Sequence, residues 1–539
     1  MEDALTPAPP VAELLEALSA PSAYRHAPAS VEVIQTHVSC VFLAGTLAYK
    51  LKKPVDLGFV DFTTCEARRV ACEDEVRLNQ ALAPGVYLRV VSVTREADGS
   101  LRVDGAGEPV EPVVEMRRLP AERMLDRLLD AGEVDNALIE TLARLLARFH
   151  SAAPTGPGVD EHGTPEAIEF NIRENAEQTE RFALERGRPG LRTLSPVLHR
   201  FLSRRAFAFL AARPELLERR VATGRVRDGH GDLHAGNVCV LPEGILVYDR
   251  IEFAPRFRCG DVAAELAFLA MDLDARGYRG FSGYLARRYA ELADDPELAE
   301  LLPFYKAYRA VVRGKVLSLT AADPLLAPAG RETHRLAAMR SFHLAASYDL
   351  PPALVLTCGL PATGKSTVAR AVAAPFEAVV LRSDVRRKQL VGLRPTERAA
   401  APFREGIYGE SLTARTYAAL LEAAARALAE GRTVVVDASF SRVEQRRPFA
   451  ALAASSGVPL AVLDVGVPGE VAAARLAARA CDEREVSDAD LDVYRELRER
   501  FEPPDELPAS QVVRIDGREP GEEAAAAAID LLAGLSAGA

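Results

Sequence analysis

The sequence lacks the cysteine pattern, the leader and the long apolar runs of secreted and membrane proteins. Its seven cysteines are odd in number and scattered, and no two of them form a C-x-x-C pair. They are typical of small core residues kept as reduced thiols. No apolar run approaches the ~20 residues of a membrane span. The first residues, MEDALTPAPPVAELLEALSAPSAYRH, show no basic segment followed by a long apolar one. We therefore expect a cytoplasmic protein that makes no membrane contact.

The chain also lacks an excess of basic charge. It contains 66 lysines and arginines and 77 aspartates and glutamates, so its net charge is 66 − 77 = −11. This charge argues against a general nucleic-acid coat or an anionic membrane surface as the main partner. A nucleic-acid end is still compatible with a local basic groove, although the net charge does not indicate it. The sequence leaves the oligomeric state open.

Changes in the hydrophobic pattern divide the chain of 539 residues, which is long enough for more than one core. Residues 1–29 are expected to be an N-terminal helical segment. Residues 30–346 form a first domain, with strands and one helix in an N-lobe (30–115) and mainly helices in a C-lobe (116–346). Tandem prolines in SYDLPPA then mark a boundary. In residues 352–539, strand and helix patterns alternate, which predicts a parallel sheet wrapped by helices.

The stretch GLPATGKST fits the phosphate-binding pattern G-x-x-x-x-G-K-[ST] through Gly359, Gly364, Lys365 and Ser366. It lies between the strand-like ALVLTC and the helix-like TVARAVAA, which is the context that the pattern requires. The glycines let the backbone wrap the phosphates, and Lys365 neutralises the β and γ phosphates. Ser366 is expected to ligate Mg²⁺, and Thr367 caps or supports the loop. This motif predicts an ATP·Mg²⁺ site in the second domain.

Further polar residues follow later strands of this domain. Asp437 ends the strand TVVVDASF, where a carboxylate can hold the metal through water; the alternative is an ordinary strand-ending aspartate. In LRSDVRRKQL, Asp384 can accept the proton of an attacking hydroxyl, and Arg387 can hold the transferred phosphoryl group. A helix cap is the alternative for Asp384. Arg475 and Arg479 lie four residues apart on one helical face, either closing over the phosphates or only solvated.

These pieces together resemble a known group of kinases. Residues 352–535, with GLPATGKST, RSDVRR and VVVDASF, look like the P-loop kinases that include zeta toxins, polynucleotide 5′-hydroxyl kinases and chloramphenicol phosphotransferase. Only the D-x-x-R element narrows the class, because the first motif is general to P-loop proteins. The resemblance implies phosphoryl transfer to a hydroxyl group, and it does not name the acceptor.

A second phosphate-handling pattern stands earlier, in HGDLHAGN, and is followed by a strand that ends in Asp249. This segment resembles the catalytic segment of aminoglycoside phosphotransferases, choline kinases and their protein-kinase-like relatives. The resemblance implies that Asp232 is the base or the orienter of the acceptor hydroxyl. It implies that Asn237 and Asp249 are oxygen ligands for Mg²⁺. His230 would brace the loop, and Glu252 would order it or join the outer shell of the metal.

The companions of this segment lie upstream in the order that the resemblance requires. Lys50, in the strand LAYKLKK, takes the place of the lysine that contacts the α and β phosphates, and Glu75 on the following helix can pair with it. Lys52 is a rival for this role, because alternate residues of a strand share a face. VVEMRRLP fits the hinge that meets the adenine. No G-x-G-x-x-G precedes VSCVFLAG; His37 and Ser39 occupy that region instead.

The order of the two halves resembles a bacterial family of bifunctional aminoglycoside phosphotransferase/ATP-binding proteins, over nearly the whole chain. It implies an α+β, protein-kinase-like bilobal domain followed by an α/β P-loop kinase domain with a parallel sheet. Each domain would bind ATP and Mg²⁺ and transfer the γ-phosphoryl group to a hydroxyl of a small molecule or a nucleotide or nucleic-acid end. No acidic patch for a cationic antibiotic is identifiable. Two alternatives stay open: one domain as a nucleotide sensor that regulates the other, and a zeta-toxin-like C-terminal kinase restrained by the N-terminal domain.

Overall fold

The N-terminal half of the chain builds a six-stranded antiparallel sheet in the order β1-β2-β3-β6-β4-β5. In the register of β2 and β3, Val41 pairs with Lys50 and Phe42 pairs with Tyr49. Because neighbouring residues of a strand point to opposite faces, Lys50 lies on the face opposite Tyr49. The strands are β1 (Val31–Gln35), β2 (Ser39–Ala44), β3 (Leu47–Lys52), β4 (Tyr87–Arg95), β5 (Leu101–Val103) and β6 (Glu108–Arg117).

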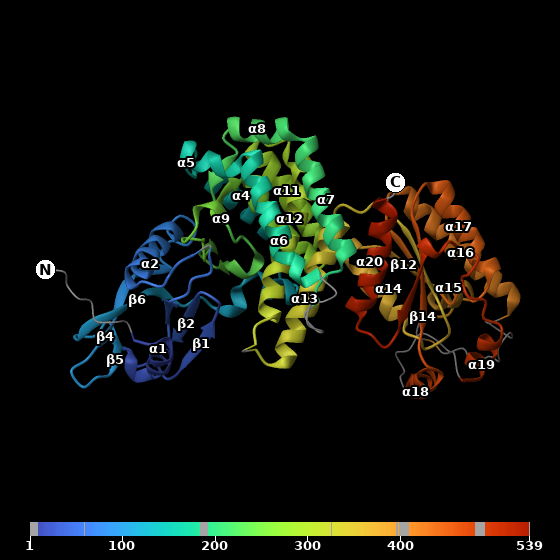
Figure 1. Ribbon diagram of the computed structural model, residues 1–539, viewed down its shortest axis with the longest axis horizontal. Coiled ribbons are helices and arrows are strands. Elements are labelled where there is room, and N and C mark those ends of the chain that lie inside the picture. Colours follow the sequence, from blue (N-terminus) through green and yellow to red (C-terminus); the bar gives the residue numbers. More distant parts are fainter. Residues whose placement is uncertain are drawn as a thin grey trace. The chain divides into compact units, whose positions relative to one another are not determined.

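One helix covers each face of this sheet (Figure 1). Helix α1 (Val11–Leu18) buries Leu14 and Leu18 in the same hydrophobic cluster as the side chains of the Tyr49 face. Helix α2 (Cys65–Asn79) packs on the other face, and the Thr64 hydroxyl caps its start by accepting a hydrogen bond from the Ala67 amide. The face that carries Lys50 is therefore the face that meets α2.

Mainly helical structure follows, interrupted by two small two-stranded sheets. Strand β7 (Val226–Asp228) pairs with β10 (Cys259–Asp261), and β8 (Val238–Leu241) pairs with β9 (Gly244–Val247). HGDLHAGN therefore joins β7 to β8, and Asp249 follows β9. The helices are α3 (Leu125–Asp130), α4 (Asn136–Ala152), α5 (Pro157–Asp160), α8 (Pro214–Ala222), α9 (Pro255–Arg258), α10 (Val262–Ala275) and α11 (Arg279–Ala293).

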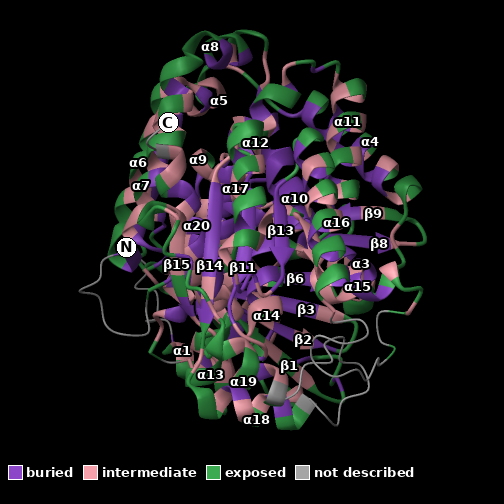
Figure 2. Cartoon of the chain, turned by 90° about the vertical axis from the view of Figure 1, so that its right-hand side faces the viewer, coloured by how far each residue is buried: buried purple, intermediate pink, exposed green. Residues whose placement is uncertain are grey.

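The C-terminal half contains a five-stranded parallel sheet in the order β12-β13-β11-β14-β15. Figure 2 shows its central strands as mostly buried, which agrees with the near-continuous apolar runs of strands covered on both faces. The five strands are β11 (Leu354–Cys358), β12 (Val379–Arg382), β13 (Val434–Asp437), β14 (Leu460–Gly466) and β15 (Val512–Asp516). Both halves of the predicted fold class are thereby confirmed.

Helices surround the parallel sheet. Within the C-terminal part they are α14 (Lys365–Ala373), α15 (Ser383–Leu390), α16 (Glu410–Ala429), α17 (Val443–Ser456), α18 (Gly469–Arg479), α19 (Leu491–Glu499) and α20 (Gly521–Ala537). The remaining four helices of the described residues come from the middle of the chain and do not belong to this layer: α6 (Pro165–Ala183), α7 (Pro196–Ala212), α12 (Leu298–Ala321) and α13 (Pro328–Ser347). Short 3₁₀ turns lie at Pro21–Ala23, Ala121–Arg123, Glu161–Gly163, Ala235–Asn237, Ala374–Phe376 and Ala509–Gln511.

The contacts of the chain define two compact units. The first joins Met1–Ile168 to Arg213–Tyr305, and the second joins Glu169–Ala212 to Lys306–Ala539. The boundary near residue 350 stays a prediction, since these units group residues by their contacts alone. The computed structural model describes residues 9–58, 60–183, 192–324, 326–394, 397, 409–479 and 491–537.

Helix α20 links the P-loop fold to helices from the middle of the chain, all within the second unit. It contacts α14 on one side and α7 and α13 on the other. Arg335 and Arg340 of α13 form ion pairs of 2.6 and 2.5 Å with Glu523 and Glu522. Asp530 of α20 accepts a hydrogen bond from the Ser195 hydroxyl, just before α7.

Two further properties agree with the composition of the chain. Six cysteines among the described residues are free thiols, and Cys481 lies outside those residues. None of the helices in the described ranges is long and apolar enough to cross a bilayer.

The burial of α1 gives a first prediction. Leu18 is fully buried, so Leu18→Ala should lower the free energy of unfolding of the N-lobe by about 2–5 kcal/mol, the usual cost of such a cavity. Urea unfolding followed by circular dichroism measures the change. Glu16→Ala, on the exposed side of the same helix, is the control; equal stability of Leu18→Ala and Glu16→Ala would show that α1 does not support the sheet.

Candidate active sites

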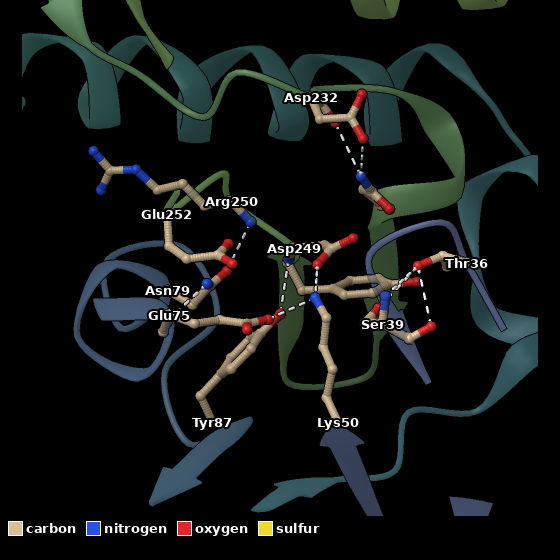
Figure 3. A network of polar contacts seen from close by, with 12 residues as sticks. Thr36, Ser39, Lys50, Glu75, Asn79, Tyr87, Asp232, Asp249, Arg250 and Glu252 are labelled. Atoms are coloured by element: carbon tan, nitrogen blue, oxygen red, sulfur yellow. Dashed lines mark hydrogen bonds and ion pairs between the residues drawn. The ribbon is translucent and has the colours of Figure 1, made fainter. Parts of the chain in front are cut away.

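Three charged groups from distant parts of the chain meet in the first unit (Figure 3). The Lys50 ammonium on β3 donates to Glu75 Oε1 on α2 at 2.6 Å and to Asp249 Oδ1, after β9, at 2.5 Å. These partners lie 25 and 199 positions from Lys50 in the sequence. The Lys50 side chain is 12% exposed and Glu75 is fully buried. The fold therefore brings together three of the residues that the sequence singled out.

Mutual attraction keeps this network charged despite its burial. Burial by itself would raise the pKa of Glu75, but the Lys50 and Lys52 ammonium groups lower that pKa to about 2. Burial favours the neutral form of Lys50, yet Asp249 and Glu75 raise the pKa of this lysine well above its ordinary value. Lys50 and Glu75 are thus both ionised at neutral pH.

Lys52, the rival lysine, has a partly different set of partners. Its ammonium donates to Glu75 Oε2 at 2.7 Å and to Glu252, and it lies 5.3 Å from the centre of the Phe62 ring. Its side chain is only 2% exposed. Glu75 therefore serves both lysines with separate oxygens, and Lys50 is the one that contacts Asp249. The assignment of Lys50 as the phosphate-contacting lysine stays a prediction.

The segment HGDLHAGN forms a tightly bonded loop. The Asn237 amide nitrogen donates to the Asp232 carbonyl at 3.0 Å and, at 3.4 Å, to the Asp232 carboxylate (Figure 3). His230 is fully buried and its Nε2 is 2.9 Å from the Tyr248 carbonyl oxygen; burial lowers the pKa of His230. His234 Nε2 lies 3.6 Å from the carboxylate of Asp232. His230 thus braces the loop from inside, as the resemblance implied.

Two carboxylates that the sequence did not single out accept hydrogen bonds from the backbone of this loop. Glu265 and Asp272 lie seven residues apart on α10, hence on one helical face. Glu265 accepts a hydrogen bond from the His230 amide at 2.7 Å, and Asp272 accepts one from the Ala235 amide at 3.0 Å. Burial would raise the pKa of Glu265, but His150 lowers it to about 2. Acidic residues inside the otherwise apolar stretch VAAELAFLAMDL were the available signal.

The proposed metal ligands of this site fit Mg²⁺ by their chemistry. Asp249 offers a carboxylate, and the nitrogen of the Asn237 amide is occupied by Asp232, which assigns the amide oxygen as the atom for a cation. Among the described residues there is no cluster of three or more His, Cys, Asp or Glu side chains suited to enclose a metal.

The β1–β2 turn occupies the position of a glycine-rich loop. The Ser39 amide donates to Thr36 Oγ1 at 3.0 Å, and the two hydroxyl oxygens are also 3.0 Å apart (Figure 3). Lys53 donates to the Thr36 carbonyl at 2.7 Å, while His37 is exposed at the tip. Side-chain hydroxyls and a lysine therefore close this turn, in place of glycines.

The second site begins with the P-loop, between β11 and α14. Gly359 and Gly364 have φ angles of 139° and 101°, and a Cβ atom on Gly359 would come within 2.3 Å of the Val465 carbonyl oxygen. Lys365 donates to the Leu360 carbonyl at 2.5 Å. Ser366 and Thr367 follow in the first turn of α14. The local strand, loop and helix agree with the sequence motif; the ligand roles of these residues stay predictions.

Other predicted residues of this site lie at the end of β13 and on α15. Asp437 closes β13, is 6% exposed, and accepts a hydrogen bond from Arg382 at 3.3 Å. Asp384 lies in the first turn of α15 but does not occupy its cap position, which belongs to Arg382. Arg387 is buried and donates to the Thr413 hydroxyl at 2.9 Å. The cap position of α15 thus belongs to Arg382, and the catalytic role of Asp384 stays a prediction.

Arg475 is attached to the P-loop. Its guanidinium donates to the Ala362 carbonyl at 3.3 Å and to the Gly517 carbonyl at 2.8 Å, so it joins the P-loop to the turn that follows β15. Arg479 ends α18, and its side chain lies outside the described residues.

A buried arginine that sequence reasoning missed holds the turn after Asp437. Phe440 has a φ of 43°, an uncommon value for a residue with a Cβ atom. Arg446 is fully buried and donates to the carbonyls of Phe440 at 2.7 Å and Glu502 at 2.9 Å. It also binds the Glu506 carboxylate. The turn is therefore fixed by side-chain bonds to its backbone.

The low pKa of Glu75 predicts an acid-sensitive N-lobe. The pKa of Glu75 in the folded state lies below the ordinary value of a carboxyl group. The stability that the Glu75 charge contributes is therefore complete when the pH is above that ordinary value, and it is lost as the pH falls toward about 2. Glu75→Gln should lower the free energy of unfolding by about 3–5 kcal/mol near neutral pH, because two buried lysines lose their shared anion. The difference from wild type should shrink as the pH falls.

Urea unfolding across a pH series measures both effects. Glu73→Gln, exposed on the same helix, is the control. A difference between Glu75→Gln and wild type that stays constant through the acid range would contradict the low pKa of Glu75.

Comparisons with known proteins show which families the chain is similar to. The family model described as "Phosphotransferase enzyme family" matches residues 61–302, and that of an "AAA domain" matches residues 354–504. Uncharacterized proteins of Mycobacterium tuberculosis and Mycobacterium bovis are each 30% identical over 452 residues, covering 84% of this chain and 86% of the relative.

Solved structures of kinases are also similar to parts of the chain. A choline/ethanolamine kinase family protein of Mesorhizobium loti is 15% identical and covers 61% of this chain and 98% of its own, with a TM-score of 0.37. A microcompartment-associated aminopropanol kinase is 17% identical, covering 62% and 97%, with a TM-score of 0.37. A gluconokinase of Sinorhizobium meliloti is 22% identical, covering 35% and 95%, with a TM-score of 0.24.

The matched family models and the mycobacterial relatives lead to one conclusion. The chain belongs to the same family as the mycobacterial proteins and is a phosphotransferase enzyme with two kinase-like domains, an aminoglycoside phosphotransferase-like domain followed by a P-loop domain.

Proposed function

We propose that each domain binds ATP with Mg²⁺ and transfers the γ-phosphoryl group to a hydroxyl group of a small molecule or of a nucleotide or nucleic-acid end. The meeting of Lys50, Glu75 and Asp249 carries this proposal, because it joins three distant segments at bonding distance in a buried setting. Such an arrangement costs desolvation energy, and buried clusters of charged groups with shifted pKa values are concentrated at functional sites.

At the first site, Lys50 would neutralise the α and β phosphates while Glu75 holds its ammonium in place. Asp232 would orient the acceptor hydroxyl and receive its proton. Asn237 and Asp249 would hold Mg²⁺, which neutralises charge on the phosphate oxygens when it is bound. Positioning and charge neutralisation account for most of the catalysis expected here.

At the second site, the P-loop amides and Lys365 would hold the β and γ phosphates. Ser366 and Asp437 would hold the metal. Asp384 would act on the acceptor hydroxyl, and Arg387 on the transferred phosphoryl group. The contacts of Arg475 with the P-loop and the Gly517 turn support a role at the rim of this nucleotide site.

Substitutions at each site should remove one activity and spare the other. Asp232→Asn should slow phosphoryl transfer at the first site by about 10²- to 10⁴-fold, the usual contribution of a positioned base. Lys365→Ala should weaken nucleotide binding at the second site by about tenfold or more, as expected for the loss of a charge-assisted hydrogen bond. ATP consumption with a panel of hydroxyl-bearing metabolites, with products identified by mass spectrometry, measures both effects.

Exposed residues of each unit provide the controls for this experiment. Asp130→Asn and Arg432→Ala lie on exposed positions and should leave both activities unchanged. The proposal fails if the wild-type protein binds no nucleotide and consumes no ATP with any acceptor.

We also propose a second function, regulation of one site by the other, for which the packing of α20 provides a link only inside the second unit. This helix contacts α14, which follows the P-loop, and also α7 and α13 from the middle of the chain. Nucleotide bound at Lys365 could thus bias helices that precede the P-loop domain in the sequence, provided that they have two arrangements.

Coupling predicts that occupation of the P-loop changes the first activity. In Arg340→Ala, the ion pair between α13 and Glu522 is lost, and the effect of ATP at the second site on the first should weaken by about two- to tenfold, within the usual range of coupling energies. Steady-state kinetics of the first activity with and without Lys365→Ala measures this effect. Independent activities in both backgrounds would exclude regulation.

A further inference from the structure

Asp249 has a backbone conformation that needs support. Its φ of 65° is in the left-handed region, which residues other than glycine seldom adopt without a reason. The Asp249 amide donates to the Tyr87 hydroxyl at 2.9 Å, and its carboxylate contacts Lys50 (Figure 3). Tyr87 is itself almost fully buried. The residues that follow Asp249 explain how this conformation is maintained.

Arg250 fastens the segment to two other elements. Its side chain donates to the Gly229 carbonyl at 2.8 Å, to the Asp228 carboxylate at 2.7 Å and to the Leu78 carbonyl at 3.3 Å. Its amide donates to the Asn79 side-chain oxygen at 3.0 Å. Arg250 is only 5% exposed. Arg250, the residue after Asp249, is therefore bound both to the C-terminal end of α2 and to the residues that precede the HGDLHAGN loop.

Glu252 fastens the same segment to β3. Its carboxylate accepts a hydrogen bond from Lys52, whose ammonium also binds Glu75 Oε2 at 2.7 Å. Between the two anchors, the Ile251 amide donates to the His230 carbonyl at 3.1 Å. Every residue from Asp249 to Glu252 thus has at least one bond that fixes its place, from α2, from β3 or from the catalytic loop.

We propose that Arg250 and Glu252 are positioning residues that hold the Asp249 carboxylate ready to bind Mg²⁺. The inference rests on the proposed role of Asp249 as a metal ligand. The two anchors and Asp249 act on one short segment, so a shift of either anchor moves the carboxylate. Fixed outer partners of a ligand of this kind raise metal affinity by removing alternative positions.

The alternative is that both residues only stabilise the core. A core role lowers the melting temperature and leaves the metal affinity of the folded protein unchanged. A positioning role weakens metal binding while the affinity for nucleotide without metal is retained. Metal binding by the folded protein therefore separates the two.

The experiment uses full-length protein with Lys365→Ala, which reduces binding at the second site. Mn²⁺ is titrated in the presence of a non-hydrolysable ATP analogue and followed by electron paramagnetic resonance. Arg250→Lys and Glu252→Gln should each raise the Mn²⁺ dissociation constant by about tenfold, within the range seen when outer partners of metal ligands are removed. Analogue binding in EDTA, measured by calorimetry, should change by less than about twofold because no nucleotide contact is altered.

Two control variants carry the same types of substitution at positions outside the segment from Asp249 to Glu252. Arg225→Lys changes an arginine that also donates to two backbone carbonyls, those of Ala293 and Asp294. Glu111→Gln changes a buried glutamate paired with Arg68. Neither should alter Mn²⁺ affinity. If Arg250→Lys does not fold, Asn79→Ala removes the acceptor of the Arg250 amide and should weaken Mn²⁺ binding in the same direction.

The outcomes distinguish this inference from the function on which it rests. Asp249→Asn should weaken Mn²⁺ binding more than either anchor variant. If it does so while the folded anchor variants bind Mn²⁺ like wild type, the positioning role is overturned and the proposed metal ligand stands. If Asp249→Asn binds Mn²⁺ like wild type, the metal role of Asp249 is wrong, and the inference falls with it.

Discussion

The first domain depends on the burial of a single carboxylate between two ammonium groups. A fully buried glutamate is tolerated only when it is paired, and Glu75 is paired twice. Its two oxygens fix the distance between α2 and β3, since Lys50 and Lys52 occupy the same face of one strand. The bonds of these lysines with Asp249 and Glu252 extend the constraint to the segment after β9. The charge of Glu75 thus links the position of α2, the lysines of β3 and the candidate metal ligand Asp249.

One structural feature is common to both domains. In each domain, a buried arginine binds a backbone carbonyl near a residue other than glycine that has a positive φ. Arg250 follows Asp249 and binds the Gly229 carbonyl, whereas Arg446 binds the carbonyl of Phe440 itself. A guanidinium suits this task because it is always charged and presents several donors in a rigid plane. Two unrelated folds therefore use the same side chain to fix a turn beside a candidate metal ligand.

Local motifs made much of this architecture predictable. GLPATGKST carries its own strand, loop and helix signals within a few residues, so Gly359, Gly364 and Lys365 could be assigned to a phosphate-binding loop from spacing alone. The partnership of Lys50 with Glu75 could be predicted from the resemblance. The same pattern could not separate Lys50 from Lys52, because both lie on one face of β3 and only tertiary contacts distinguish them.

The roles of residues whose partners lie far away in the sequence could not be predicted from the sequence. Glu265 binds an amide 35 positions away, and Arg250 binds carbonyls 21 and 172 positions away. Hydrophobic periodicity does not reveal such pairs, because it shows which side of a helix or strand is buried but not which residues contact that side. The contacts of α20 with α7 and α13 are of the same kind.

The place of α20 bears on how this protein could have evolved. Its Glu522, Glu523 and Asp530 side chains all have partners on or beside helices that precede the proline-rich linker. A recombination event at that linker would deliver a P-loop kinase without the arginines and the serine that its last helix uses. The proline-rich linker looks like a suitable recombination point in the sequence. In the structure it is unsuitable, because recombination there would separate α20 from its partners. The second compact unit thus contains segments from both sides of the linker, and inheritance in one gene keeps that unit whole.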